Sequence, residues 1–190
     1  ALGLGLTLFA TLAVIQTSLN RQIETTIPKR APSFFALDIP KEEEANFRRI
    51  VTGIAPDAAI ATVPSLRGPV MAVAGRRVAD MKEIPEEAWF LRGDRGLTFA
   101  RDLPAGSRIT AGQWWPKDYA GPPLVSIDEK AANAVGLKIG DSIIVSVLGV
   151  EIEAKIASFR EINWDTLGFN YVLVFDPATL APVAFVALPP

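Results

Sequence analysis

The first twenty residues contain no charged side chain, and this run constrains the chain's organisation more than any other feature. From Arg21 onward, charges recur every few positions and turn-forming residues are frequent. An α-helix rises about 1.5 Å per residue, so twenty residues can cover roughly the 30 Å hydrocarbon core of a bilayer. The most apolar part is 1–15. We therefore expect a transmembrane helix that lacks its first residues.

Two other interpretations of this run are a secretory signal peptide and a helix buried in a protein core. A signal peptide needs a positively charged start and a small-residue cleavage site, whereas this chain opens on Ala1-Leu2-Gly3. The length of the run favours a bilayer helix over a core helix. We therefore expect a transmembrane helix rather than either alternative.

A stalk is expected to continue this helix beyond the membrane. Leu19, Ile23 and Ile27 recur every fourth residue and keep one apolar stripe, until Pro28 stops the helix. The predicted organisation is therefore the end of a transmembrane helix and a stalk over 1–27, followed by a folded domain over 28–190.

Composition narrows the chemistry that the chain can perform. With 19 basic and 21 acidic residues and a net charge of -2, the chain offers nucleic acid no electrostatic footprint. Cysteine and histidine do not occur in it, which excludes Ser-His-Asp and Cys-His catalysis and the usual zinc sites. Ser126, Lys130 and scattered carboxylates such as Glu151 leave a hydrolase as a remote alternative. We predict no enzyme, no catalytic residue, no cofactor and no metal site.

Local patterns predict an α+β fold, with a mixed β-sheet and few short helices. One helix is expected to begin at Pro40 and end at Gly53, with an apolar face formed by Phe47, Ile50 and Val51. Another helix is expected after Ser126, which with Glu129 matches a capping box, and to be closed by Gly136. The predicted strands are 33–39, two or three short ones within 58–78, 142–148, 150–157, 171–175 and a further one at 185–188, and 86–99 predicts a hairpin turning at 93–96.

An irregular, aromatic-rich segment between Pro104 and Pro123 supplies the candidate contact residues, Trp114, Trp115 and Tyr119. These side chains could form a hydrophobic contact surface for a lipid-like ligand or a partner protein. The alternative is that buried aromatic rings hold this segment against a sheet. Adjacent residues of an extended chain point to opposite faces, so at most one tryptophan needs to be exposed.

Three stretches carry a family resemblance: SLNRQIETTIPKRAPSFFALDI, FLRGDRGLTFARDLP, and ITAGQWWPKDYAGPPLVSIDEKAANAVGLKIGDSIIVSVLGVEIEAKIASFREINWDTLGFNYVLVF. In this order they are similar to the extracytoplasmic domain of bacterial FtsX-like ABC transporter permeases of the MacB type, nearest to the YbbP-like branch. The resemblance covers roughly residues 1–176, whereas 55–85 matches poorly and could form a divergent lobe.

The resemblance implies a periplasmic domain, with a MacB-like core, of a bacterial inner-membrane permease that works with a separate cytoplasmic ABC ATPase. The stalk at 17–26 would then act as a mechanical coupler (mechanotransmission), and the substrate would be a hydrophobic or lipid-linked molecule. Implied partners are the ATPase, membrane lipid and a periplasmic partner or lipid-like substrate. The alternative is a membrane-anchored extracytoplasmic sensor or ligand-binding domain, which would use a cleft near Trp114 and Trp115.

Overall fold

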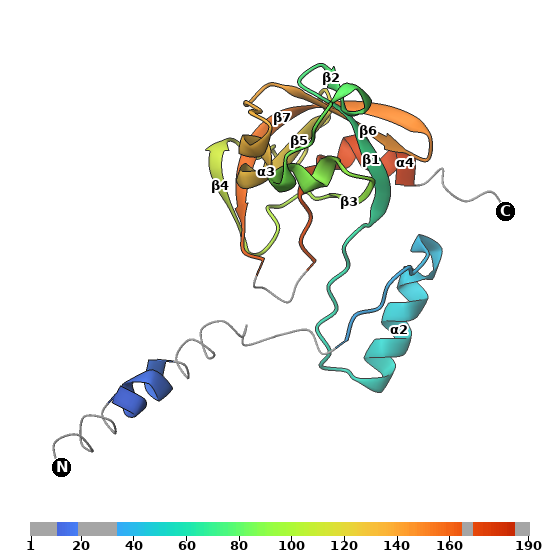
Figure 1. Cartoon of the computed structure of the whole chain (residues 1–190). Coiled ribbons are helices and arrows are strands. Elements are labelled where there is room, and N and C mark those ends of the chain that lie inside the picture. Colours follow the sequence, from blue (N-terminus) through green and yellow to red (C-terminus); the bar gives the residue numbers. More distant parts are fainter. Residues whose placement is uncertain (1–10, 19–33, 165–168, 185–190) are drawn as a thin grey trace, which may run out of the picture. The chain divides into compact units, whose positions relative to one another are not determined.

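The computed structural model describes residues 11–18, 34–164 and 169–184 (Figure 1). The chain divides into two compact units, one comprising Ala1–Ala61 with Trp164–Gly168 and the other Thr62–Asn163 with Phe169–Pro190. The predicted stalk residues Leu19, Ile23 and Ile27 lie outside the described residues, as does the predicted boundary between 27 and 28.

The described N-terminal part of the first unit is a short helix. Residues 11–18 are helical and exposed, whereas the first ten residues of the predicted transmembrane segment lie outside the described part. Among the residues that the structure describes, no helix combines the length and the apolar character needed to cross a bilayer.

The second helical segment of this unit follows Pro40. A 3-10 turn, η1 (Lys41–Glu43), leads directly into helix α2 (Glu44–Ile54). Its acidic first turns are favourable because the helix dipole is positive there. The helix runs one residue past the predicted end at Gly53, because the N–H of Ala55 still donates to the Val51 carbonyl over 2.8 Å.

The strand predicted over 33–39 is wrong in its described part. Residues 34–39 adopt no regular secondary structure. Aromatic and branched side chains favour a strand locally, but a strand needs a neighbour, and no strand pairing in the described chain involves these residues.

Eight strands form the sheet in the described part of the second unit. They are β1 (Leu66–Val73), β2 (Arg76–Arg77), β3 (Asp94–Phe99), β4 (Ser107–Gly112), β5 (Leu124–Asp128), β6 (Ser142–Val147), β7 (Val150–Ile162) and β8 (Leu173–Phe175). The accompanying helices are η2 (Val78–Asp80), η3 (Glu86–Leu91), α3 (Glu129–Ala134) and α4 (Pro177–Ala184). The sheet-dominated body with few short helices confirms the predicted α+β class.

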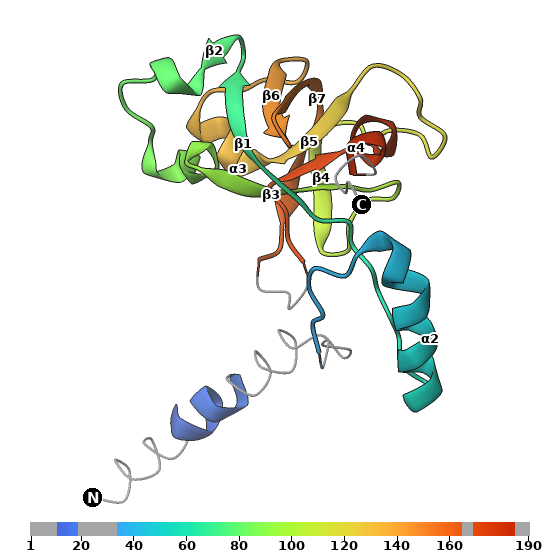
Figure 2. The same cartoon turned by 90° about the vertical axis from the view of Figure 1, so that its right-hand side faces the viewer.

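Strand pairing closes six of these strands into a ring. The order is β2-β1-β3-β8-β5-β7-β4, and β6 pairs with both β1 and β7, which completes a circuit through β1, β3, β8, β5, β7 and β6. The β3/β8 and β5/β7 pairs are parallel, and the other pairs are antiparallel. Each of the six strands in this closed ring therefore has a hydrogen-bonded neighbour on both sides for at least part of its length. Helix α4 lies beside β3 (Figure 2).

Alternating side chains fill the interior of the second unit. On β6, Ile143, Val145 and Val147 are fully buried and alternate with half-buried residues, as expected of a strand with one face in a core. All three residues of β8 are buried, which agrees with the apolar run predicted there.

Three element predictions in the second unit are corrected. Residues 86–91 form the 3-10 helix η3 after Pro85 rather than the first strand of a hairpin, and its Phe90 and Leu91 enter the core. Strand β7 continues to Ile162, five residues beyond its predicted end, because β4 and β5 pair with its second half. Strand β6 ends at Val147, because Leu148 takes a positive φ of 53° in the turn that follows. The possible strand at 185–188 lies outside the described residues.

The predicted capping box is also wrong. Ser126 lies inside β5, and the residue that caps α3 is Asp128, whose carboxylate accepts the N–H of Ala131 over 3.0 Å. The pairing of β5 with β7 extends through Asp128, so the strand occupies the position at which the box would begin. The end of α3 is as predicted, since Gly136 takes a φ of 69°, where glycine is unstrained.

Candidate functional site

The two adjacent tryptophans lie just beyond β4 and are anchored to the end of β3. The indole N–H of Trp115 donates to the Ala100 carbonyl, and that of Trp114 donates to the Arg101 carbonyl, each over 2.9 Å. Their ring centroids are 4.0 Å apart, with 30° between the planes. Trp115 is 4% exposed and Trp114 is half-buried. Both polar indole groups are therefore satisfied by the protein, and the part of this pair that meets solvent is supplied mainly by Trp114.

The third predicted contact residue, Tyr119, is held within its own turn. Its hydroxyl donates to the Pro122 carbonyl over 2.7 Å. Burial, and to a lesser degree the negative charge of Asp176, raises the pKa of Tyr119. A Cβ at Gly121 would lie 2.5 Å from the Tyr119 oxygen, so a larger residue there would displace the ring from this position. The structure thus brings Trp114 and Trp115 together and fixes Tyr119 separately in the same segment.

A buried polar cluster lies where β5 and β7 pair. The hydroxyl of Ser158 donates to Ser126 Oγ over 2.8 Å, and Ser126 Oγ donates to the Ser158 carbonyl over 3.2 Å. Neither serine has any exposed surface. Ser126 is therefore enclosed, whereas Lys130 on α3 is exposed.

Arg160 is the centre of this cluster and is only 1% exposed. Its hydrogen-bond acceptors are Ser126 Oγ at 3.0 Å, Ser107 Oγ at 3.3 Å, and the carbonyls of Tyr171 at 2.9 Å and Val172 at 3.1 Å. Burial lowers its pKa to about 10, partly opposed by the charge of Asp128. At neutral pH the side chain is thus a buried cation that joins β7 to β5, β4 and the segment that leads into β8.

Sequence analysis missed Arg160, although a signal for it exists. On β7 the even-numbered positions from Ala154 to Ile162 are all buried, and Arg160 falls on this inward-facing set. Because the strand was expected to end at residue 157, its second half was not assigned an inward face.

Glu151 is engaged in an ion pair at the surface. Arg77 donates to its two carboxylate oxygens over 2.5 and 3.2 Å. This hydrogen bond is the main cause that lowers the pKa of Glu151. Among the described residues, no three acidic side chains come together in a group that could hold a metal ion.

The first unit presents an apolar stripe on α2, formed by Phe47, Ile50, Val51 and Ile54. Phe47 and Val51 are half-buried, whereas Ile50 is 48% exposed and Ile54 is 82% exposed. The spacing of three, four and seven residues places them on one helix face. Sequence analysis identified the first three as an apolar face, but it did not identify a surface or include Ile54.

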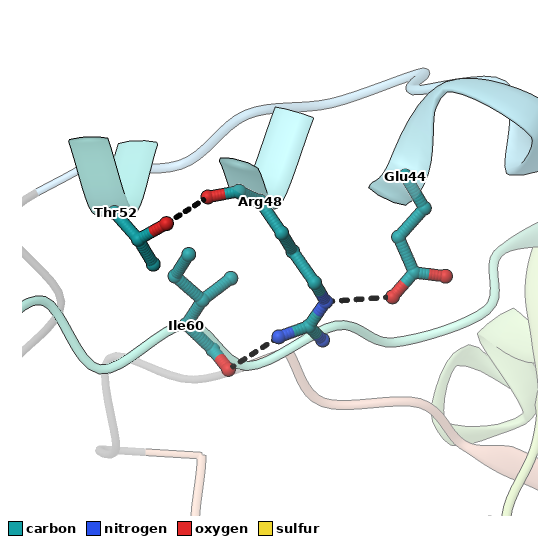
Figure 3. Close-up of polar contacts among 4 residues, drawn as sticks. All are labelled: Glu44, Arg48, Thr52 and Ile60. Carbon is teal, nitrogen blue, oxygen red and sulfur yellow. Dashed lines mark hydrogen bonds and ion pairs between the residues drawn. The ribbon is translucent and has the colours of Figure 1, made fainter. Parts of the chain in front are cut away.

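Arg48 joins α2 to the segment that follows it (Figure 3). Its Nε donates to Glu44 over 3.1 Å within the helix, and its Nη1 donates to the Ile60 carbonyl over 3.5 Å. Thr52 donates back to the Arg48 carbonyl over 2.9 Å. These polar contacts order the helix and the returning chain, and they leave Ile50 and Ile54 largely exposed.

Comparison with known proteins relates this chain to a transporter permease. No family model matches the chain, and no solved structure matches it. The chain is similar to the uncharacterized ABC transporter permease YbbP of Escherichia coli (strain K12), with 26% identity over 180 residues. The match covers 95% of this chain and 21% of that protein, so the chain spans about a fifth of the relative's length. This similarity supports a relationship with ABC transporter permeases.

Proposed function

We propose that this chain is the periplasmic domain of a bacterial FtsX-like, MacB-type ABC transporter permease in the inner membrane. The observation that carries the proposal is the 26% identity to a permease over 95% of the chain. The charge-free first twenty residues support membrane attachment, and the absence of cysteine and histidine from the sequence supports a non-enzymatic part.

The proposed role is to couple ATP hydrolysis by a separate cytoplasmic ATPase to movement outside the membrane. In this role the N-terminal helix passes displacement through the stalk stripe of Leu19, Ile23 and Ile27 to the folded unit. A unit that transmits displacement has to resist local opening. Dense packing and few unpaired strands both provide such resistance. The closed six-strand ring and the buried Arg160 hydrogen bonds supply this resistance.

The proposed substrate is a hydrophobic or lipid-linked molecule that meets the aromatic segment. The half-buried Trp114 and Tyr119 present partly apolar surface there, and Trp115 fixes the segment to the end of β3. Aromatic side chains whose polar groups are already satisfied offer apolar area without exposing unpaired donors.

The test purifies the tagged full-length permease from membranes of its native host and asks whether an ABC ATPase accompanies it. We expect the two proteins to co-purify from membranes and to hydrolyse ATP. The variant Ile23→Pro should uncouple hydrolysis from substrate release because proline would break the helix proposed for the stalk, whereas Ile23→Ala should retain coupling. Failure of any ATPase to associate would refute the proposal, and co-purification of a signalling enzyme instead would favour the sensor alternative.

A further inference from the structure

We infer that helix α2 rests on the lipid surface of the bilayer through its apolar stripe of Phe47, Ile50, Val51 and Ile54. The inference rests on the membrane attachment in the proposed function, and it adds a second contact between the chain and lipid. An amphipathic helix at an interface buries its apolar face about 5–10 Å into the boundary between headgroups and acyl chains.

The first unit has no hydrophobic core among its described residues. None of residues 11–18, 34–61 and 164 is buried, whereas the second unit contains every buried core residue found in the described chain. In the segment that precedes α2, Phe34 is 93% exposed and Leu37 is 68% exposed. Exposed apolar side chains gathered in one segment mark a surface that another apolar phase covers.

Chain connectivity favours lipid as that phase. Residues 11–18, from the charge-free run that is expected to enter the bilayer, belong to the same compact unit as α2. An extended chain spans at most about 3.6 Å per residue, so Phe34 can lie no more than about 60 Å from Ser18. The bilayer that this run is expected to enter is therefore within reach of the segment that leads into α2.

The charged side chains on and just before α2 cancel, which favours binding to an uncharged apolar surface over binding to a strongly charged partner. Lys41, Arg48 and Arg49 are balanced by Glu42, Glu43 and Glu44 over the same segment. Binding would then depend on apolar burial rather than on attraction to anionic groups. Pairing of α2 with a second copy is disfavoured, because a helical coiled coil needs an apolar repeat sustained over about three heptads or more, and α2 has 11 residues.

The experiment uses single-cysteine variants of the whole chain, because the natural sequence contains no cysteine. An environment-sensitive nitrobenzoxadiazole label is placed at Ile54→Cys on the stripe and at Ala45→Cys. Ala45 is exposed and lies nine residues before Ile54, or two and a half turns at about 3.6 residues per turn, so it is on the opposite face. A third label at Val14→Cys reports membrane entry of the N-terminal run.

With phosphatidylcholine vesicles, we expect the Ile54 and Val14 labels to shift to shorter emission wavelengths and to be quenched by doxyl-labelled lipid. Iodide quenching of the Ile54 label should fall by about half or more, since that face enters the interface, while the Ala45 label stays accessible. Circular dichroism of each variant establishes that the fold is retained.

Each remaining outcome overturns the inference. If the Val14 label enters lipid and the Ile54 label does not, the inference fails and the membrane attachment stands. If neither label enters lipid, both fail. Shielding of the Ile54 label without vesicles, increasing with protein concentration, would show that a second copy covers the stripe.

Discussion

Arg160 on β7 donates a hydrogen bond from Nε to Ser126 Oγ on β5 over 3.0 Å, and both side chains are almost completely enclosed. The register between these two parallel strands shifts between Val125 and Ser126. The pair therefore joins neighbouring strands beside an irregularity, where the regular backbone ladder is interrupted. A buried cation with this many acceptors holds several elements in one arrangement.

Replacing Arg160 by methionine should destabilise the second unit strongly. The Tyr171 carbonyl and Ser126 Oγ would lose the guanidinium N–H groups that they accept from, whereas the Val172 carbonyl would keep the N–H of Asp128. An unsatisfied buried polar group costs about 1–3 kcal/mol. Relief of the desolvation penalty on the buried cation offsets part of this loss. We expect the free energy of unfolding in urea to fall by about 2–4 kcal/mol.

The matched control is Arg108→Met on β4. Arg108 is an arginine whose side chain is 74% exposed and paired with Glu161. Its replacement should change the free energy of unfolding by less than about 1 kcal/mol. Equal effects of the two substitutions would contradict the structural role given to Arg160.

Truncating Trp115 to alanine should destabilise the protein more than truncating its neighbour. Trp115 is 4% exposed, and removal of a buried tryptophan side chain costs about 3–5 kcal/mol. Trp114 is half-buried, so Trp114→Ala should cost less than about 2 kcal/mol. Chemical denaturation of both variants measures the difference, and a larger effect at Trp114 would show that the burial is assigned to the wrong ring.

Alanine at Gly112 should be far less tolerated than alanine at Gly75, although the two glycines have nearly the same φ of 73° and 74°. Left-handed backbone strain costs a non-glycine residue about 1–2 kcal/mol at either position. A Cβ at Gly112 would also lie 2.2 Å from the Ala157 carbonyl oxygen, whereas Gly75 has nothing within 4 Å. This contact should add about 1–3 kcal/mol to the loss of unfolding free energy. Indistinguishable melting temperatures for the two variants would count against the packing of β4 on β7.

The ion pair between Arg77 and Glu151 should give a defined pH dependence. The hydrogen bond from Arg77 lowers the pKa of Glu151 from its ordinary value of 4.5, so the folded state releases this proton more readily than the unfolded state. The resulting stabilisation is present above pH 4.5 and is lost as the pH falls through the folded-state pKa. Carbon-13 NMR titration should show the Glu151 carboxyl returning toward its ordinary pKa in Arg77→Met. An unchanged titration curve in that variant would exclude the pair.

Local pattern predicted several elements because local chemistry decides them. Alternation of Ile143, Val145 and Val147 with smaller or half-exposed residues predicts β6, and Gly149 predicts the turn into β7. Gly136 predicts the end of α3 because its positive φ requires glycine. Three of the four stripe residues on α2, Phe47, Ile50 and Val51, likewise follow from helical spacing, whereas Ile54 lies beyond the predicted end of the helix at Gly53.

Elements and site contacts that depend on distant partners could not be predicted in this way. The aromatic content of 89–91 favours a strand, but burial of Phe90 and Leu91 in the core is what selects η3. The second half of β7 exists because β4 and β5 pair with it. The environment of Arg160 and the carbonyl partners of Trp114 and Trp115 likewise come from residues remote in sequence.

In the proposed function, ATP hydrolysis by the partner ATPase moves the folded domain relative to the N-terminal run that is expected in the bilayer. The most direct test is a pulsed electron-spin measurement on the full-length permease with its ATPase in lipid nanodiscs. Spin labels at Val14→Cys and at the exposed Lys130→Cys report the distance between anchor and domain. We expect trapping with ATP and vanadate to shift this distance distribution. An ATPase variant that lacks its catalytic glutamate should bind ATP but should not reach the distribution of the trapped state. Identical distributions in the nucleotide-free, ATP-bound and trapped states would contradict the claim.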